Sequence, residues 1–569
     1  MIKEKLLKNL GVVLKKIGVD EIEINLEHPS NPDFGDYATS IALKLAKTLK
    51  KNPIQIAEEI KKNFSKNNFI EKIEVVKPGF INFWINTNYF LNYARKITQE
   101  IFDFPSFHLG KNKKIMIEFA HPNTHKLFHI GHLRNISSGE AICRILQAVG
   151  NNVIRANYQG DVGLHIAKCV YKLKSQSASW RTKIENLKTL HGKIEFLGKM
   201  YAEGNKAYET DEIAKKEIIE INKMIYEQNG EVIPLWKETR QWSLDYFDEI
   251  YKRVYTKFDR LYFESEMSNK GTQITKEALE KGILEKSEGA IVFNGKSYAL
   301  DTRVFLNRLG IPTYEGKELA LAEKEFSEFG EIDKCIHVVG PEQSSFFKVT
   351  FKVEELLNPK KYKGKQMHHI GGWVRLKQGK MSSRSGVVVE GPWLLDEAKK
   401  RILKDFKCDE DTAEAISVAA VKYSFLKNHI SAEIAFDFDE SISLEGNSGP
   451  YLLYTFVRTQ SVLNKSTYHL GTTWINNGIA KLEKEERDLL RTLANYSETV
   501  YEAARNFSPN LIANYLYDLA QKYNLFYQKH KILLTEEKIR IFRLLLTKAT
   551  GQVIKNGLYL LGIKTVNKM

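Results

Sequence analysis

Two histidines close together in the chain are the first residues whose types and spacing suggest chemistry. His129 and His132 enclose Ile130 and Gly131, and this His-Ile-Gly-His motif lies between an expected strand and an expected helix. At a helix start, residues three apart share one face beside a positive N-terminus, where phosphate binds well. Gly131 has no side chain, so a base or ribose could approach the backbone closely. Paired histidines alone are more often surface residues or metal ligands, but this strand-to-helix location favours a nucleotide site.

A second motif is the glycine-containing stretch GKMSSRSG at residues 379–386. Such a loop in isolation is usually a solvated turn. Beside the first motif it predicts a loop that delivers Lys380 to the pyrophosphate of ATP, with Ser382 and Ser383 as hydroxyl donors. We therefore expect ATP to be bound by residues of both motifs, namely Gly131, His129, His132, Lys380, Met381, Ser382 and Ser383.

The elements around these motifs predict a parallel sheet. An apolar strand at residues 115–119, a helix that ends at Gly150 and a second strand at residues 153–157 form a βαβ unit. Strand signals return at residues 335–340 and 367–371, before the second motif. Two such halves separated by helices indicate a Rossmann-type parallel-sheet catalytic core in an α/β multidomain protein.

Periodicity and charge divide the chain further. Residues 1–88 alternate helical and strand patterns and predict an α+β N-terminal domain. We place the catalytic domain at residues 111–400, with a helical insertion at about 171–290, and a helical connector at 401–449. Residues 450–569 hold 17 basic and 9 acidic residues and ten of the 26 tyrosines. This last segment predicts an all-α bundle with a basic face, which is either simply solvated or binds RNA.

Composition limits the class of protein. The chain has 569 residues, of which 43% are hydrophobic and 27% charged, as in a globular multidomain protein. A net charge of +15 favours polyanionic partners. The four cysteines form no C-x-x-C pair, so we expect neither zinc nor disulfides, and a reducing cytoplasm. No apolar run approaches the roughly 18 residues of a membrane span.

The two motifs resemble the HIGH and KMSKS signatures of class I aminoacyl-tRNA synthetases, and the surrounding blocks resemble the arginyl-tRNA synthetase family. The blocks that carry this resemblance are EFAHPN before the first motif, VIRANYQGD, YFESE, TYEGKELALA, VVGPEQ and GPYLLYTFVRTQ. It covers essentially the whole chain. It implies that residues 1–88 approach the outer corner of tRNA and that residues 450–569 bind the anticodon.

The resemblance also implies the residues that bind arginine. A guanidinium is a planar fork of five donors that keeps its charge, so its pocket needs carboxylates and planar acceptors. The corresponding positions here have suitable side chains and are Glu118, Asn123, Tyr314, Glu318 and Gln343. The residues implied to stabilise moving phosphate charge are His129, His132, Lys126 and Lys380.

Two positions depart from the family pattern. The family commonly has Asp where this chain has Glu318, which lengthens the side chain by one methylene. Ser383 replaces the second lysine of KMSKS, and many arginyl enzymes rely instead on a lysine just before HIGH. Because Lys126 and Lys380 are both present, the division of labour between them stays open.

The resemblance implies an arginine–tRNA ligase that forms arginyl-adenylate from ATP, with Mg²⁺, and transfers arginine to tRNA(Arg). The expected partners are therefore L-arginine, ATP and tRNA(Arg), with no membrane, and the family expectation is a monomer. Three alternatives stay open: a synthetase for another amino acid, a small nucleotidylyltransferase and a catalytically silent tRNA-binding paralogue. A cysteine-specific synthetase would need zinc ligands, and a nucleotidylyltransferase would leave the basic C-terminal bundle unexplained. The HIGH sequence and the KMSS part of the second motif are intact, which argues against the silent paralogue.

Overall fold

The computed structural model describes residues 1–20, 22–64, 68–99, 112–176, 180–181, 184, 187–377, 389–466 and 482–569. The chain forms two compact units, each assembled from distant parts of the sequence. The first unit comprises residues 1–105, 452–505 and 514–557, and the second comprises residues 106–451, 506–513 and 558–569. The second motif, including Lys380, Met381, Ser382 and Ser383, lies outside the described residues.

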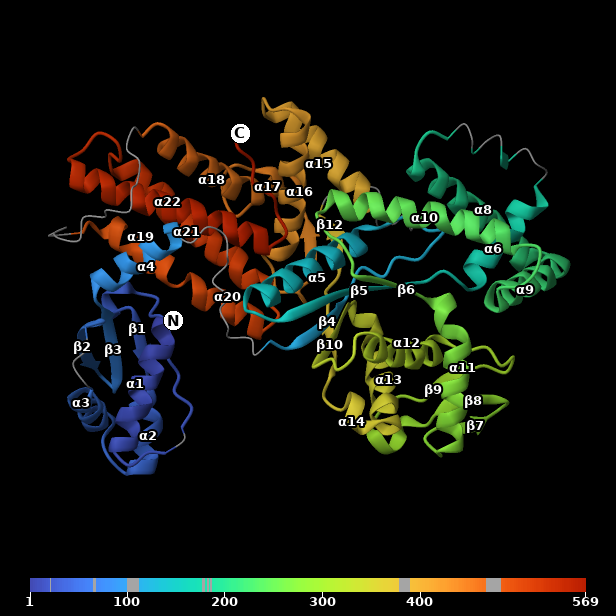
Figure 1. Cartoon of the computed structure of the whole chain (residues 1–569), viewed down its shortest axis with the longest axis horizontal. Helices are drawn as coiled ribbons and strands as arrows, with labels where there is room; N and C mark the ends of the chain where they lie inside the picture. Colours follow the sequence, from blue (N-terminus) through green and yellow to red (C-terminus); the bar gives the residue numbers. More distant parts are fainter. Residues whose placement is uncertain are drawn as a thin grey trace. The chain divides into compact units, whose positions relative to one another are not determined.

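A five-stranded parallel sheet forms the centre of the second unit (Figure 1). Its strand order is β11-β10-β4-β5-β6. The strands are β4 (Lys114–Glu118), β5 (Asn152–Gln159), β6 (Arg260–Phe263), β10 (Lys334–Val339) and β11 (Gln366–Ile370). The order reverses between β4 and β10, which is the Rossmann arrangement with its ligand crevice at the reversal point. The predicted α/β fold class is confirmed.

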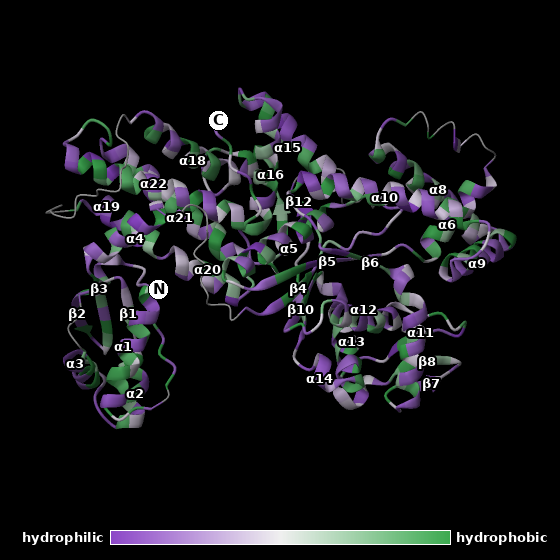
Figure 2. Ribbon diagram, in the orientation of Figure 1, coloured by the Kyte–Doolittle hydropathy of each residue, from purple (hydrophilic) through white to green (hydrophobic). Residues whose placement is uncertain are grey.

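Apolar strands explain why this sheet is central. Ile115, Met116 and Ile117 follow one another in β4 and are all buried. Such continuous apolar runs are typical of parallel strands covered on both faces (Figure 2). The register places His337 of β10 directly beside Glu118 of β4, so these two polar side chains lie on the same face of the sheet.

One strand of this sheet was not predicted. β6 has only four residues, and only Tyr262 among them is fully buried. A run this short carries no clear period-2 or apolar signal, and its flanks are helical. The sequence also did not predict the parallel pair of β12 (Val374–Leu376) and β13 (Ile434–Phe436).

Helices α5 (Ile130–Ala148) and α13 (Ser344–Leu357) make the crossovers that flank the reversal point. Four helices follow β5: α6 (Leu164–Ser175), α8 (Leu190–Thr210), α9 (Glu212–Glu227) and α10 (Ile233–Arg253). The range predicted for the helical insertion, about 171–290, begins within α6 and extends past α10 across β6 of the central sheet. α11 (Glu264–Glu280), a small antiparallel sheet and α12 (Tyr314–Glu328) then lead to β10. The strands of that small sheet are β7 (Glu285–Ser287), β8 (Ala290–Phe293) and β9 (Arg303–Leu306).

Of the remaining helices of the second unit, α15 (Gly391–Asp405) and α16 (Glu410–Leu426) pack against α5, α17 (Phe438–Ile442) packs against α15 and α16, and α14 (Pro359–Tyr362) packs against α13. Lys422 of α16 is fully buried and donates to the carbonyl oxygens of Val254 and Gly562, at 2.9 and 2.6 Å. These bonds fix the C-terminal segment, residues 558–569, within the second unit.

The first unit joins the N-terminal sheet to helices from the far end of the chain. Its antiparallel sheet has the order β1-β3-β2, with β1 (Tyr37–Thr39), β2 (Ile70–Val76) and β3 (Phe80–Ile85). Its N-terminal helices are α1 (Ile2–Lys16), α2 (Ile41–Leu49), α3 (Pro53–Asn63) and α4 (Thr87–Gln99). Its C-terminal helices are α18 (Gly449–Asn464), α19 (Lys484–Ala494), α20 (Tyr496–Arg505), α21 (Pro509–Lys529) and α22 (Glu537–Leu560). Of these, α18, α21 and α22 also include residues that belong to the second unit.

A buried carboxylate links the two parts of the first unit. Asp36 accepts a bond of 2.6 Å from the backbone nitrogen of Ile85 and is ion-paired with Arg491. Pro32–Phe34 form a short 3-10 helix, and the side chain of its N-cap Asn31 accepts a bond from the backbone nitrogen of Asp33. Across the described ranges, no helix is both long and apolar enough to cross a membrane.

Candidate active site

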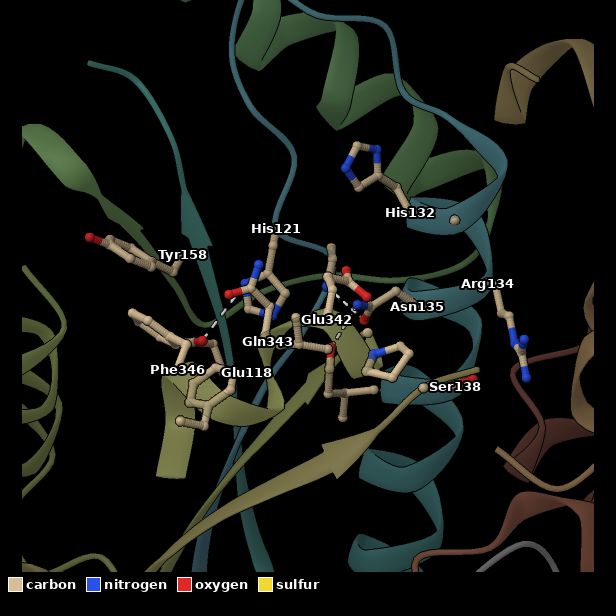
Figure 3. Close-up of a pocket in the computed structure, with 18 of the residues that line it drawn as sticks. Glu118, His121, His132, Arg134, Asn135, Ser138, Tyr158, Glu342, Gln343 and Phe346 are labelled. Atoms are coloured by element: carbon tan, nitrogen blue, oxygen red, sulfur yellow. Dashed lines mark hydrogen bonds and ion pairs between the residues drawn. The ribbon is translucent and has the colours of Figure 1, made fainter. Parts of the chain in front are cut away.

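A cavity of about 670 Å³ lies at the carboxyl ends of β4 and β10, where the strand order reverses. It brings together every predicted site residue that the structure describes except Lys126, namely Glu118, Asn123, His129, Gly131, His132, Tyr314, Glu318 and Gln343. Figure 3 shows His132 on α5 apart from Glu118 and Gln343. We call the part around His129 and His132 the histidine end, and the part around Glu118 and Glu318 the acid end.

At the histidine end, the two rings cap α5 reciprocally. The backbone nitrogen of His132 donates to Nδ1 of His129, and that of His129 donates to Nδ1 of His132, each at 3.2 Å. The ring centroids are stacked 3.5 Å apart. Because Nδ1 accepts in both rings, each uncharged ring carries its proton on Nε2 and has an Nε2–H to donate.

The surroundings keep both rings uncharged. Burial, and then the positive charge of Lys126, lower the pKa of His129 to about 4. Burial and the neighbouring His129 lower the pKa of His132 well below its ordinary range. Lys126 is exposed and does not line the cavity, so its influence here is electrostatic. A Cβ atom at Gly131 would come within 3.0 Å of the His129 ring, so a side chain there would crowd the histidine.

The loop between β4 and α5 is held by bonds to two neighbouring segments. Thr124 donates its backbone N–H to the oxygen of Gly160 at 2.8 Å, after β5. The backbone nitrogen of His125 donates to Ser243 Oγ of α10 at 3.0 Å. A Cβ atom at Gly160 would lie 2.1 Å from Asn123 Oδ1, so only glycine lets Asn123 sit where it lines the cavity.

At the acid end, two buried carboxyl groups offer oxygen atoms without protein partners. Glu118 and Glu318 are 2% and 4% exposed. Among the described residues, Glu118 Oε2 and Glu318 Oε1 have no hydrogen-bond partner. An unpaired buried carboxylate oxygen costs stability, so such atoms at a cavity indicate a ligand that donates hydrogen bonds.

The other predicted arginine residues lie around this end. Tyr314 begins α12 and is 63% exposed, at the rim, with Lys317 Nζ 4.6 Å from its ring centre. Gln343 precedes α13 and lines the cavity close to β10 (Figure 3). His121 Nδ1 lies 3.7 Å from Glu118 Oε1.

Sequence reasoning missed several residues behind the acid end. His337 Nδ1 lies 3.0 Å from Glu118 Oε1, and Glu325 and Glu354 are also fully buried. The available signal was a single histidine within the apolar strand CIHVVG, since a polar residue in a buried strand needs a partner.

Arg134 was also missed. Its guanidinium donates to the carbonyl oxygens of Trp373, Ile430 and Ala432, at 2.6, 2.8 and 2.6 Å. These contacts hold the segments around β12 and β13 against α5, beside the cavity.

Two groups of described residues have metal-ligand types within 4.8 Å of one another. The first group is Glu325, Cys335 and His337, and both ring nitrogens of His337 already face hydrogen-bond partners, Glu118 and Gln366. In the second, His191, Glu195 and Glu390, the histidine Nε2 lies 2.8 Å from Glu390 Oε2. Hydrogen bonding accounts for the first group and for the His191–Glu390 contact, and the expectation of no zinc stays a prediction.

Comparison with known proteins identifies the family. Residues 99–438 match the catalytic domain of class I tRNA synthetases (R), residues 452–569 the DALR anticodon binding domain and residues 2–85 the arginyl tRNA synthetase N-terminal domain. The arginine–tRNA ligase of Fusobacterium nucleatum is 34% identical over 556 residues, covering 95% of this chain and 94% of that one. That of Clostridium beijerinckii is 31% identical, covering 97% of each.

Solved structures show the same fold. Arginyl-tRNA synthetase from Thermus thermophilus superposes with a TM-score of 0.83 at 24% identity, covering all of both chains. That from Plasmodium falciparum has a TM-score of 0.82 at 22% identity and covers 100% of this chain and 99% of that one. The predicted enzyme class is confirmed, and the chain belongs to the arginyl-tRNA synthetase family of class I aminoacyl-tRNA synthetases.

Proposed function

We propose that this chain is an arginine–tRNA ligase that activates L-arginine with ATP and transfers it to tRNA(Arg). The observation that carries the proposal is one cavity with two Nε2–H donors at one end and two unpaired carboxylate oxygens at the other. The first end suits phosphate, and the second suits a guanidinium.

In the first step, the arginine carboxylate attacks the α-phosphate of ATP, and pyrophosphate leaves. The Nε2–H groups of His129 and His132 stabilise the charge that moves over the phosphates, and Gly131 lets the nucleotide lie against the helix start. Lys126 adds positive charge near His129. From the second motif we assign Lys380 to the pyrophosphate, with Met381, Ser382 and Ser383 in the same ATP-binding loop. No side chain acts as a nucleophile, because positioning and charge stabilisation suffice.

Mg²⁺ fits this site as a companion of ATP. Three of the lining carboxylates, Glu118, Glu264 and Glu315, face His337, Lys317 and Arg303 respectively. Because Glu318 is assigned to the guanidinium, the ion would be held chiefly by phosphate oxygens, with the exposed Glu342 as a lining carboxylate available to it. When bound, it supplies charge neutralisation at the phosphates.

In the second step, the terminal ribose hydroxyl of tRNA attacks the activated carbonyl, and AMP leaves. The guanidinium stays between Glu118 and Glu318 during both steps, which keeps the reacting carbonyl in place. Asn123, Tyr314 and Gln343 complete the arginine pocket as planar or hydroxyl partners.

We further propose the roles of the domains. Residues 1–88 contact the outer corner of tRNA, residues 401–449 connect the catalytic domain of residues 111–400 to the bundle, and residues 450–569 bind the anticodon. The insertion at about 171–290 belongs to the catalytic domain. The family expectation is a monomer that works in the cytoplasm without zinc and without a membrane partner.

Charging of total tRNA with each amino acid in turn tests the function. Charging with arginine alone is the expected result, and it should need both ATP and Mg²⁺. Charging with another amino acid would overturn the specificity, and no charging with any would overturn the ligase assignment.

A further inference from the structure

Four buried carboxyl groups gather behind and beside the acid end. We call Glu118, Glu318, Glu325 and Glu354, together with His337, the acid cluster. None of the four carboxyl groups is more than 4% exposed, and His337 is fully buried. The five residues of the acid cluster come from four elements: Glu118 from β4, Glu318 and Glu325 from α12, His337 from β10 and Glu354 from α13. Only Glu118 and Glu318 line the cavity.

A hydrogen-bonded chain fixes the charge of His337. Its Nδ1 lies 3.0 Å from Glu118 Oε1, and its Nε2 lies 3.0 Å from Gln366 Oε1. Gln366 turns its amide nitrogen the other way, toward Glu354 Oε2 at 2.9 Å. Both oxygens that face the ring are acceptors, so both ring nitrogens carry protons and His337 is an imidazolium cation.

The charge balance of the cluster follows from this geometry. The cation at His337 is paired with Glu118, which leaves three further carboxyl groups, Glu318, Glu325 and Glu354, in the same dry region. Isolated buried carboxylates are costly, and such groups keep their protons instead. The empty pocket is therefore near neutral, although it must hold a guanidinium cation.

The pKa shifts agree with this balance. Burial alone would raise the pKa of Glu118, but the charge and hydrogen bond of His337 outweigh it and lower that pKa to about 2. Burial raises the pKa of Glu318 well above its usual range, and it raises that of Glu354 to about 7. Burial and the nearby Glu118 raise the pKa of Glu325 well above its usual range.

Other titratable and charged groups around Glu318 and the rest of the acid cluster leave this balance unchanged, because each is either paired or uncharged: burial raises the pKa of Tyr158 and of Cys335, so both keep their protons. These groups are Glu315 and Lys317 on α12, His121 after β4, Tyr158 of β5, Glu264 of α11 and Cys335 of β10. Glu315 is paired with Arg303 at 2.8 Å, and Lys317 is paired with Glu264. Burial lowers the pKa of His121, so this ring adds no cation.

We propose that L-arginine binding releases one proton from Glu318 to solvent, and that His337 is a positioning residue that keeps Glu118 ionised before arginine arrives. The carboxyl O–H bond of Glu318 breaks, the proton goes to buffer, and the new carboxylate pairs with the guanidinium, which keeps its own protons. The proposal rests on the function proposed above. Glu318 is the donor because Glu325 and Glu354 do not line the cavity.

Calorimetry of arginine binding tests the proposal on the full chain without any mutation. The titration is run at one neutral pH in two buffers with different ionisation enthalpies, PIPES and Tris. Release of about one proton per arginine should make the apparent enthalpy differ between the buffers in proportion to their ionisation enthalpies. Equal enthalpies overturn the inference alone. Absence of arginine binding in both buffers overturns the proposed function as well.

Two variants separate the roles, with a matched control. Glu318→Gln has no proton to lose, so it should bind arginine more weakly and without buffer dependence. In His337→Gln the cation is gone, so Glu118 should also be protonated in the empty pocket, and release should rise to about two protons. Glu355→Gln changes the half-exposed neighbour of Glu354 on α13 and should leave the proton count as in the wild type.

The proton count distinguishes positioning from simple packing. If His337→Gln weakens arginine binding but releases the same number of protons as the wild type, His337 only fills space, and its proposed role is wrong. If Glu318→Gln still releases a proton, the donor has been misassigned. Folding of each variant is checked by thermal unfolding before titration.

Discussion

At the histidine end of the pocket two uncharged rings bond to each other's backbone, whereas at the acid end four carboxyl groups share one cation. The histidines come from a single turn at the start of α5, and their reciprocal bonds to each other's backbone need no other element. The acid cluster exists only when four elements pack together. The first end is thus set by local structure and the second by tertiary structure, and the two should respond differently to substitution and to pH.

Removal of a histidine donor should have the largest effect. His132→Ala should lower kcat of arginine-dependent ATP–pyrophosphate exchange by about 10² to 10³-fold, because one donor to the moving phosphate charge is lost. The arginine KM should change little, because the guanidinium is held at the other end. Exchange is measured with tRNA(Arg) present.

His132→Gln is the matched control for this prediction. Its amide nitrogen replaces the Nε2–H donor, so it should recover part of the lost kcat. The alanine variant also loses one side of the α5 cap, which costs about 1 kcal/mol of unfolding free energy. A rise in arginine KM as large as the fall in kcat would show that the two ends are not independent.

Loss of the charge on Glu118 should affect binding more than chemistry. Glu118→Gln should raise the arginine KM by about 10 to 100-fold, since a hydrogen bond between charged groups is worth about 1.5–3 kcal/mol. It also leaves the His337 cation buried without its counter-ion, so thermal stability should fall.

The double variant Glu118→Gln/His337→Gln tests the pairing. Removing both members of the pair should lower the free energy of unfolding by less than the sum of the losses in the two single variants, because the double variant leaves no unpaired buried charge. Additive losses in the free energy of unfolding would show that Glu118 and His337, whose Oε1 and Nδ1 atoms lie 3.0 Å apart, are not energetically coupled.

The same contrast explains what sequence could predict. The HIGH-type motif is contiguous, and the βαβ pattern around it predicted the parallel sheet, whereas the arginine-binding residues were implied by the resemblance to the arginyl-tRNA synthetase family. His337, Gln366 and Glu354 are single residues in three separate elements, and each alone is an ordinary polar residue. Their meeting depends on the register that places His337 beside Glu118, which no local pattern encodes. β6 was missed for a related reason, since four residues beside long helices are too few to show a period.

Lowering the pH should affect the two ends of the pocket differently. The pKa of His129 is lowered to about 4, so its uncharged donor form is present above that pH and is lost only as pH falls through about 4. The pKa of Glu318 is raised, so its charged form in the arginine complex must be made by releasing a proton, which acid opposes. Between neutral pH and about 6, kcat should be nearly flat while the arginine KM rises by up to about tenfold per pH unit.

This pH profile is measured with wild type and with Glu318→Gln. The variant should have a higher arginine KM that no longer depends on pH in this interval. If kcat in the wild type falls with acid as steeply as the arginine affinity does, the histidine end titrates in this range and the contrast between the two ends is wrong.

The smallest effect is expected for Glu318→Asp. The family commonly has Asp at this position, so the shorter carboxylate keeps its charge and its direction into the pocket while moving back by one methylene. The arginine KM should change by only about two- to fivefold, because an aspartate can still accept from the guanidinium directly or through a water. Discrimination against citrulline should persist, since its neutral ureido group cannot form the ion pairs that a guanidinium makes with Glu118 and with the new aspartate; in Glu318→Gln it should weaken, because one of those ion pairs is lost for arginine while the amide can still donate to the citrulline oxygen. The measurement is kcat/KM for arginine and citrulline on the wild type and both variants. Loss of discrimination in Glu318→Asp as large as in Glu318→Gln would mean that side-chain length, rather than charge, sets selection at the acid end.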